Sequence, residues 1–127
     1  MAQNRAHTHS GLKTSLWQSM LSLRNLDAAW EKVRQNGGCA GGDNLTVGMF
    51  QPGAGRRLSD IANALKCGAY AQGPYRVIDI AKKKGGHRRL LIPSLTDRVV
   101  HTAIAQVLGP ILDPQFEESS FAYRPGR

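Results

Sequence analysis

Basic residues crowd around a glycine pair in the second half of the chain. They are Lys82, Lys83, Lys84, His87, Arg88 and Arg89. Like charges this close together repel one another, and a bound polyanion offsets that repulsion. Arginine offers phosphate a forked hydrogen-bond donor and lysine a mobile point charge, so the cluster suits a polyphosphate or a nucleic acid. The alternative is a solvated hairpin tip, in which lysine protects a strand edge from aggregation.

The charge of the whole chain points in the same direction. Its 127 residues include 17 Lys and Arg against 9 Asp and Glu, which gives a formal net charge of +8. Between Arg76 and Arg98 there are seven basic residues against two acidic ones, so this short segment carries +5 of the total. A basic segment of this kind favours an anionic partner. The length and an apolar fraction of 41% allow one small domain with a modest core.

The sequence gives no signal for a membrane protein, a disulfide framework or a metal site. No apolar run approaches the ~20 residues that a membrane helix requires, and the polar N-terminus lacks the apolar core of a signal peptide. We therefore expect a cytoplasmic protein without a membrane partner. Cys39 and Cys67 lack CxxC spacing, and His7 with His9 makes only a weak ligand pair, so no metal is expected to bind.

The hydrophobic pattern predicts three helices before the basic cluster. A flexible leader over residues 1–14 precedes a short amphipathic helix that begins near residue 16. Asn25 is the expected N-cap of a second helix, which a glycine pair at residues 37–38 ends. A third helix is expected over residues 58–66. The glycine-rich segment 36–43 is predicted to be an exposed loop.

The basic cluster itself lies on a predicted β-hairpin. Residues 76–81 and 88–92 have the β-branched and aliphatic content typical of strands. Gly85-Gly86 supplies the positive φ angles that a hairpin turn requires. The predicted fold class is therefore α+β, with helices around a small antiparallel hairpin.

A final helix is predicted after the hairpin. Ser94 and Asp97 form a capping-box pattern at its start, and Gly109-Pro110 is expected to stop it. Its buried stripe should consist of Val99, Val100, Ala103, Ile104, Val107 and Leu108. Asp97 is expected to cap this helix, and Arg98 to pair with Asp97 or with a neighbouring carboxylate, so neither is predicted to be catalytic.

Two blocks of the sequence, residues 75–98 and 119–127, resemble a known family. Together they resemble the fingers of bacterial reverse transcriptases of the group II intron type, including those associated with CRISPR loci. The preceding segment, with Asn25 and the glycine loop, resembles the N-terminal extension of these enzymes. The resemblance covers roughly residues 16 to 127 and implies that residues 15–127 are the N-terminal extension and fingers of a right-hand polymerase, without its palm and thumb.

The resemblance also assigns a nucleotide site. These enzymes carry Ile-Pro-Lys, a short glycine turn and Arg-x-Leu-x-Ile-Pro, and the counterparts here begin at Ile80 and at Arg88. The family's lysine and arginine grip the triphosphate of the incoming nucleotide, which makes Lys82 and Arg88 the expected nucleotide contacts. Ala81 departs from the pattern, because the family usually has proline there.

Other residues are expected to contact the template or the primer–template duplex. They are Lys83, Lys84, Arg89, Phe121, Arg124 and Arg127. Arginine and lysine can reach phosphate, and an aromatic ring can stack on a base. For Phe121 the alternative is a place in the hydrophobic core.

Catalysis in this family uses two metal ions held by clustered aspartates. The sequence contains no Tyr-x-Asp-Asp turn, and its only adjacent acidic pair, Glu117-Glu118, should point to different sides. The chain is therefore expected to hold no catalytic residue and no cofactor of its own, although Mg²⁺ is expected for the complete enzyme.

The sequence is compatible with three functions. In the first, the chain is the front part of a reverse transcriptase. It binds RNA template, DNA primer and dNTP, and the palm and thumb are supplied elsewhere, for example by a separate chain. Alternatively, it is a free-standing RNA-binding module derived from such an enzyme. The third interpretation is a decayed retroelement reading frame without a function of its own.

Overall fold

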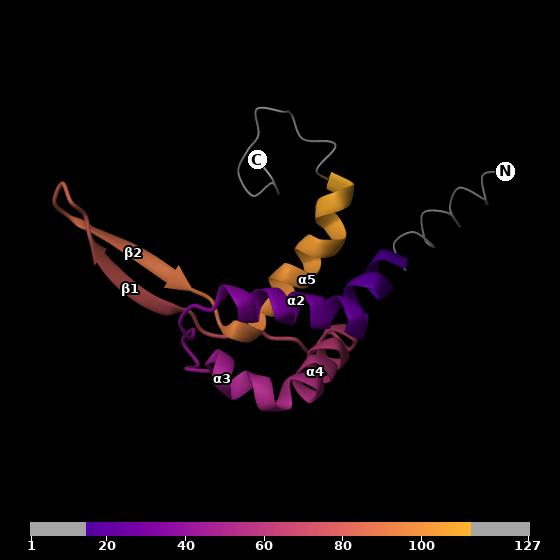
Figure 1. The fold of residues 1–127 in the computed structure, drawn as a ribbon. Helices are drawn as coiled ribbons and strands as arrows, with labels where there is room; N and C mark the ends of the chain where they lie inside the picture. The colour runs from indigo at the N-terminus through magenta and orange to yellow at the C-terminus, as the bar shows by residue number, and fades with distance from the viewer. Residues whose placement is uncertain (1–14, 113–127) are drawn as a thin grey trace.

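A β-hairpin projects from a group of packed helices (Figure 1). The computed structural model of the chain describes residues 15–112. After a helical segment at residues 15–21 come α2 (Leu23–Asn36), α3 (Val47–Phe50), the 3-10 helix η1 (Gln51–Gly53), α4 (Ala54–Lys66), β1 (Arg76–Ala81), β2 (His87–Ile92) and α5 (Leu95–Leu112). This arrangement confirms the α+β class, with helices and one small antiparallel sheet.

Helix α2 begins earlier than predicted. Ser22, and not Asn25, is its N-cap, because the Ser22 hydroxyl accepts a hydrogen bond from the Asn25 N–H at 3.1 Å. The Asn25 side chain instead donates to the carbonyls of Met20 and Ala103, which ties the start of α2 to α5. At the other end Gly37 has a φ of +63°, so the predicted glycine stop is confirmed.

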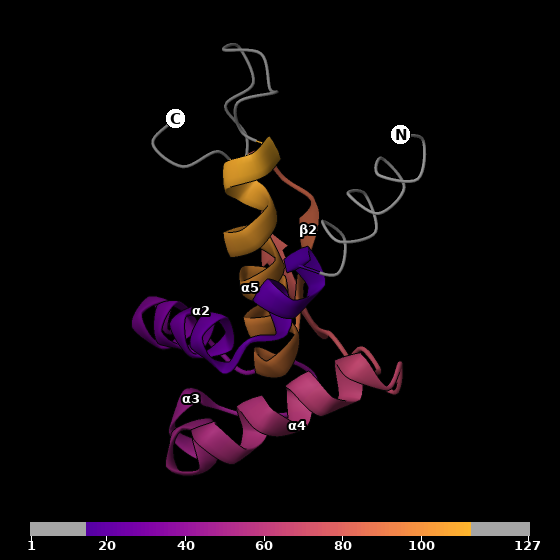
Figure 2. The ribbon, with the colours of Figure 1, turned by 90° about the vertical axis from the view of Figure 1, so that its right-hand side faces the viewer.

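The core of the body lies where α2, α4 and α5 meet, with the first half of α5 beside α2 (Figure 2). Phe50 has no exposed surface, and its ring stacks on Trp30 with the centroids 4.3 Å apart. Burying a side chain of this size stabilises a protein by roughly 1.5–3 kcal/mol. The buried apolar residues are Leu26, Ala29, Trp30, Val33, Phe50, Leu58, Ile61, Ala62, Leu95, Val99, Val100 and Ala103.

Helix α5 runs to Leu112 and contains Pro110, so the predicted stop at Gly109-Pro110 is wrong. Proline removes one backbone donor, but its fixed φ is helical and only two residues of α5 follow it. The predicted buried stripe of α5 is confirmed in the first half of the helix, where Val99, Val100 and Ala103 are buried. In the second half Ile104 and Val107 are half-buried and Leu108 is 38% exposed, and these three line an apolar groove of about 310 Å³ with Leu16, Trp17 and Met20.

Strands β1 and β2 form an antiparallel two-stranded sheet in which Ile80 pairs with Arg88. Two backbone hydrogen bonds close the turn, from the Gly85 N–H to the Lys82 carbonyl at 3.1 Å and from the Lys82 N–H to the Gly86 carbonyl at 3.0 Å. Gly85 and Gly86 have φ angles of +92° and +80°, as the sequence predicted. Both predicted strands are confirmed, and β2 begins one residue earlier, at His87.

The glycine loop after α2 is only partly exposed, which corrects the prediction for residues 36–43. Ala40 and Gly41 are buried. A Cβ atom on Gly41 would lie 2.5 Å from the Ser94 Cα, and one on Gly42 would lie 2.6 Å from the Tyr75 carbonyl oxygen. The two glycines therefore permit close approach of backbone to backbone, and the loop packs against the chain at the base of the hairpin.

Within residues 15–112 no helix is both long and apolar enough to cross a membrane. The predicted leader, residues 1–14, lies outside the described residues.

Candidate nucleic-acid interface

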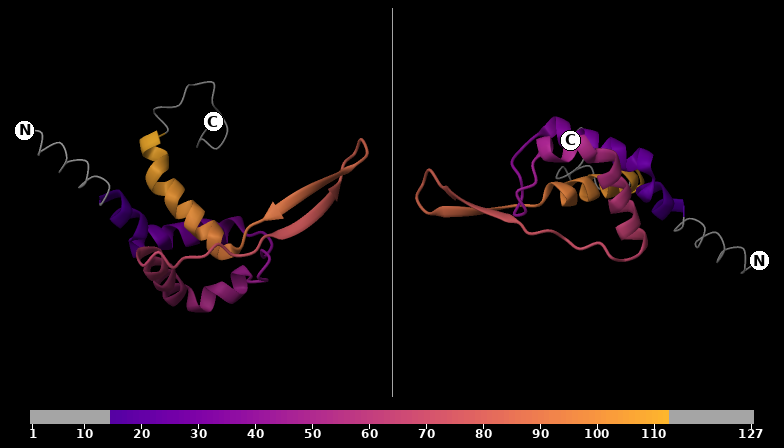
Figure 3. Two further views of the ribbon diagram at one scale, coloured as in Figure 1. Left: turned by 180° about the vertical axis from the view of Figure 1, so that it is seen from behind. Right: turned by 90° about the horizontal axis from the view of Figure 1, so that it is seen from below.

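The tip of the hairpin carries the basic residues that the sequence singled out. Lys82, Lys83 and Lys84 form the turn, Arg88 and Arg89 follow on β2, and all five residues are exposed. Figure 3 shows from two further sides that the hairpin extends away from the helices. The structure therefore gathers these five predicted contacts on one projecting element.

The strand register divides the cations between the two faces of the hairpin. Successive side chains of a strand point to opposite faces, so Arg88 shares a face with its partner Ile80, and Arg89 shares the other face with Asp79. The Arg89 Nε lies 3.8 Å from the Asp79 Oδ1, and these side chains are 72% and 63% exposed. An ion pair this exposed contributes little, so phosphate can displace Asp79 from Arg89.

Apolar side chains on both faces of the hairpin are also open to solvent. Val77 and Leu91 pair across the strands and are each 53% exposed. Ile80, on the opposite face, is 44% exposed. The hairpin therefore presents apolar surface beside its cations, a combination that can pack against nucleobases or sugars.

Arginine holds the base of the hairpin against the glycine loop. The Arg76 Nε donates to the Ala40 carbonyl at 2.8 Å, and its Nη2 donates to the Asn44 Oδ1 at 2.6 Å. From α5, the Arg98 Nη2 donates to the Cys39 carbonyl at 2.7 Å. Within residues 15–112, Arg98 thus donates to backbone carbonyls and pairs with no carboxylate, so the predicted pairing with Asp97 is wrong. The Cys39 carbonyl belongs to the glycine loop, outside helices and strands, and Arg98 supplies it with a donor.

Asp97 has a structural role at the start of α5. Its side chain is buried, and its N–H donates to the Ser94 Oγ at 3.1 Å, which confirms half of the capping pattern. The carboxylate accepts from the Gly73 N–H at 2.9 Å and from the Tyr70 hydroxyl. Burial, together with the Asp97 carboxylate, raises the pKa of Tyr70 above its ordinary value of 10.0. Asp97 thus ties α5 to the segment that leads into β1.

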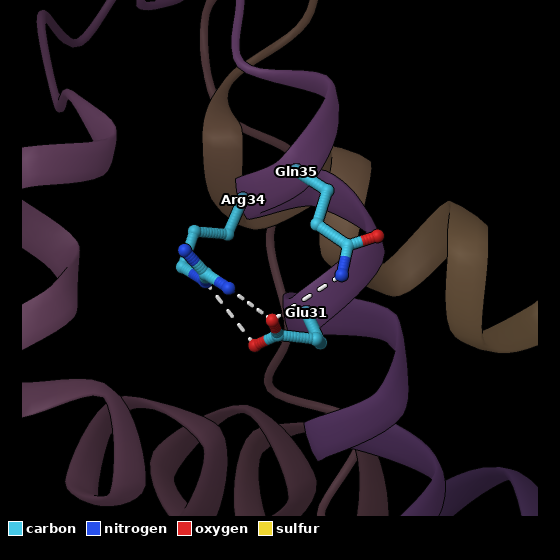
Figure 4. A network of polar contacts seen from close by, with 3 residues as sticks. All are labelled: Glu31, Arg34 and Gln35. Atoms are coloured by element: carbon cyan, nitrogen blue, oxygen red, sulfur yellow. Dashed lines mark hydrogen bonds and ion pairs between the residues drawn. The ribbon is translucent and has the colours of Figure 1, made fainter.

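Another charged group lies on the last turns of α2 (Figure 4). Glu31 accepts hydrogen bonds from the Arg34 Nε at 3.2 Å and from the Gln35 Nε2 at 3.4 Å. The hydrogen bond from Arg34 lowers the pKa of Glu31, and the same contact raises the pKa of Arg34. The charge of Arg34 is therefore matched by a hydrogen-bonded carboxylate, whereas the Arg89 Nε at the hairpin is only 3.8 Å from the exposed Asp79 carboxylate.

Three predicted nucleic-acid contacts, Phe121, Arg124 and Arg127, lie outside the described residues. Within residues 15–112, no three His, Cys, Asp or Glu side chains gather closely enough to hold a metal ion. The described residues therefore offer no ligand set for the Mg²⁺ that the resemblance implies for a complete enzyme.

The contacts that fix the hairpin base could not be predicted from the sequence. The sequence places Arg76 only within the basic segment, because its bonds to Ala40 and Asn44 join positions more than thirty apart in the chain. The glycine pairs at 37–38 and 41–42 gave no warning, because paired glycines also mark ordinary exposed loops.

Comparison with known proteins gives partial matches. The chain is 38% identical over 72 residues to the group II intron-encoded protein LtrA of Lactococcus lactis subsp. cremoris, which covers 56% of this chain and 12% of that protein. It is 37% identical over 70 residues to an uncharacterized 91 kDa protein in the cob intron of Schizosaccharomyces pombe, covering 55% and 9%. It is also 33% identical over 87 residues to protein YkfC of Escherichia coli (strain K12), covering 68% and 23%. No family model matches the chain.

The chain is related to intron-encoded proteins. This relation extends over part of its length and supports the predicted resemblance to intron-encoded reverse transcriptases at that coarse level. The chain spans less than a quarter of the length of each of these three relatives.

Proposed function

We propose that this chain is the N-terminal part of an RNA-directed DNA polymerase and that its hairpin tip binds the template–primer and the triphosphate of the incoming dNTP. The exposed cationic turn carries this proposal. Its lysines and arginines project from the body on a hairpin whose register is fixed by paired strands. The partial relation to intron-encoded proteins supports the same function. The proposal covers intron-encoded and CRISPR-associated enzymes alike.

Lys82 and Arg88 are the proposed nucleotide contacts. The Lys82 N–H bonds to the Gly86 carbonyl in the turn, directly beyond the last strand pair of Ala81 and His87, and Arg88 is the second residue of β2, so Lys82 and Arg88 lie diagonally across the hairpin. Diagonal neighbours in an antiparallel pair are about 7–8 Å apart, which a triphosphate can span. The forked arginine and the mobile lysine would then hold different phosphate groups.

The remaining basic residues are proposed to contact the nucleic-acid backbone. Lys83 and Lys84 occupy the outer corner of the turn, and Arg89 lies on the face opposite to Arg88. Contacts of this kind release counterions from the nucleic acid, so binding should weaken steeply as salt rises. The chain is not proposed to catalyse nucleotide transfer by itself. Metal-binding carboxylates would come from a palm in the same or in a separate polypeptide.

A free-standing RNA-binding module is the second candidate. The closed core of the body favours it over a decayed reading frame, because Leu26, Phe50 and Val99 are fully buried within the described chain. A body with such a core can present the hairpin without further domains. This candidate differs from the first in one respect: it gives the nucleotide no role in binding.

The test is a fluorescence-anisotropy titration of a labelled RNA template annealed to a DNA primer, at low and at high salt, with and without the dNTP that matches the template. The double variant Lys82→Ala, Arg88→Ala is compared with wild type. A matched control, Arg56→Ala with Lys66→Ala, removes the same charge from exposed positions on α4.

Wild type should bind in a salt-sensitive manner, and the matched dNTP should tighten binding only when Lys82 and Arg88 are present. The control should keep the nucleotide effect. Salt-sensitive binding without any effect of dNTP would replace the first candidate by the RNA-binding module. Absence of binding would exclude both.

A further inference from the structure

The glycine loop between α2 and α3 touches both connections of the hairpin to the body. On the side that leads into β1, the Gly42 N–H donates to the Pro74 carbonyl at 2.9 Å. On the side that follows β2, Gly41 lies against Pro93 and Ser94, so that an added Cβ would meet backbone atoms at 2.5–2.7 Å. Among residues 15–112, the strands of the hairpin contact chiefly each other and make no broad contact with a helix. The loop therefore packs against the base of the hairpin at both of its connections to the body.

The guanidinium groups of Arg76 and Arg98 bind the glycine loop in this position. Arg76, the first residue of β1, bonds to the Ala40 carbonyl and the Asn44 amide oxygen at 2.8 Å and 2.6 Å. Arg98, in the first turns of α5, bonds to the Cys39 carbonyl at 2.7 Å. Both strand connections are thus tied to one loop through charge-assisted hydrogen bonds, which are about twice as strong as neutral ones.

The same contacts withdraw these arginines from solvent. Both residues are half-buried, whereas the basic residues at the tip are exposed. The Arg98 Nε is buried. Asn44 keeps a left-handed φ of +62° while its side chain accepts from Arg76, which indicates that the loop conformation is built around this bond.

We propose that Arg76 and Arg98 are positioning residues, which lock the loop of residues 37–44 beneath the hairpin and so fix the direction in which its cationic tip points. The proposal rests on the proposed function, because the direction of the tip matters only if the tip binds a ligand. Arg76 and Arg98 act through Lys82 and Arg88 and do not themselves contact phosphate.

The first test needs no ligand. Residual dipolar couplings of backbone amides are measured for wild type, Arg76→Ala and Arg98→Ala, with Arg56→Ala on α4 as a control that removes the same charge. In wild type and in the control, the amides of the hairpin and of the helices should fit one alignment tensor. In Arg76→Ala and Arg98→Ala the hairpin should need its own tensor. One common tensor in both variants, or two tensors in wild type, would overturn the proposal.

A gentler variant guards against loss of the fold. Asn44→Gly keeps the left-handed backbone accessible and removes the acceptor for the Arg76 Nη2, at the cost of greater backbone freedom at this position. It should loosen the hairpin to a smaller extent than Arg76→Ala. Couplings identical to wild type would show that this bond does not hold the loop.

The second test is a double-mutant cycle on binding of template–primer with dNTP. Arg76→Ala should weaken binding about tenfold in the wild-type background and less than about twofold in the background of Lys82→Ala, Arg88→Ala, because its effect passes through those two residues. Additive losses would mean that Arg76 contacts the ligand directly, and would overturn the proposal. Arg76→Lys keeps the charge but lacks the fork, so full recovery of binding by lysine would also overturn it.

The two tests separate two failures. If wild type binds no nucleic acid, the proposed function is wrong, while the dipolar couplings still decide whether the arginines fix the hairpin. If wild type binds and the couplings do not change in the variants, the positioning role alone is wrong.

Discussion

The base and the tip of the hairpin use the same kinds of side chain in different ways. At the base, Arg76 and Arg98 donate to backbone carbonyls of the glycine loop at 2.7–2.8 Å. At the tip, the lysines of the turn and Arg88 are exposed on a narrow projecting element. The same net charge thus includes cations that hold the protein together and cations that face solvent.

The difference shows why a count of basic residues overstates a binding site. At the base, carbonyl groups of the glycine loop lie outside helices and strands and need other donors, which Arg76 and Arg98 supply. At the tip the backbone N–H and carbonyl groups bond to one another across the turn, so the basic side chains are not needed as donors to backbone carbonyls. Accessibility and local backbone geometry, more than charge, distinguish the proposed ligand contacts from the structural arginines.

The largest effect is expected from packing at the base. Gly41→Ala places a methyl group 2.5 Å from the Ser94 Cα, and the three nearest atoms are all backbone atoms of Pro93 and Ser94, which cannot rotate away as a side chain would. We expect the free energy of unfolding to fall by about 3 kcal/mol, measured by urea denaturation followed by far-UV circular dichroism.

Gly55→Ala is the matched control, because nothing lies within 4 Å of its added methyl group. This change in α4 should leave stability unchanged or raise it by up to about 1 kcal/mol. If Gly41→Ala were as stable as wild type, the loop would not pack against Ser94 and the contrast between base and tip would fail.

The next effect concerns the bond between Tyr70 and Asp97, close to the base. Tyr70→Phe removes a donor from a buried carboxylate and should cost about 2 kcal/mol near neutral pH. Because the pKa of Tyr70 is raised in the folded protein, the native state keeps this proton at a pH where the unfolded chain loses it. The stability that Tyr70 contributes is thus complete below pH 10 and falls as the pH rises above it.

Urea midpoints of wild type and Tyr70→Phe, measured below and above pH 10, test this prediction. The difference between the two proteins should shrink as the pH rises, since lysines and other groups titrate equally in both. A difference that stays constant with pH would mean that the pKa of Tyr70 is not raised in the folded protein.

A smaller effect is expected at the tip. Gly86→Ala meets no atom within 4 Å, and its cost arises only from the left-handed φ of +80°. We expect a loss of about 1 kcal/mol that is confined to the hairpin. Amide hydrogen exchange should quicken for the strands and stay unchanged in α2 and α5. Equal acceleration in the helices would show that tip and base are not independent.

The smallest effect belongs to the exposed pair of Asp79 and Arg89. Asp79→Asn should change the free energy of unfolding by less than about 0.5 kcal/mol, since both side chains are largely exposed. The same variant should bind template–primer at least as tightly as wild type, because it frees Arg89 and removes a negative charge. Weaker binding in the anisotropy assay would mean that Asp79 holds Arg89 in the orientation that binding requires.

Local features of the fold could be predicted from the sequence because neighbouring residues determine them. The strand residues, the glycines with positive φ at positions 85 and 86, and the end of α2 at Gly37 all follow from short segments. The cap of α2 was misplaced because Ser22 and Asn25 are equally good caps by type. Only the long-range bonds of Asn25 to α5 decide between them.

Features that depend on distant residues could not be predicted. The bond of Arg98 to Cys39 joins residues 59 positions apart, and no local pattern signals it. Of the candidate site, the exposed tip could be predicted from the basic cluster, whereas its support by the glycine loop could not. The roles of Lys82 and Arg88 stay predictions.

The pairing of α2 with α5 also bears on how the chain folds during synthesis. The Asn25 amide bonds to the Ala103 carbonyl, 78 positions later, so the core cannot close until α5 has left the ribosome. The hairpin strands are joined by only a short turn and can pair as soon as they emerge, because closing a short loop loses less entropy. Two strands alone are only marginally stable, so the nascent hairpin opens and closes, with Val77 and Leu91 open to solvent, until the body that supports it has formed. That order makes the exposed strand edges a point at which chaperones could engage the growing polypeptide.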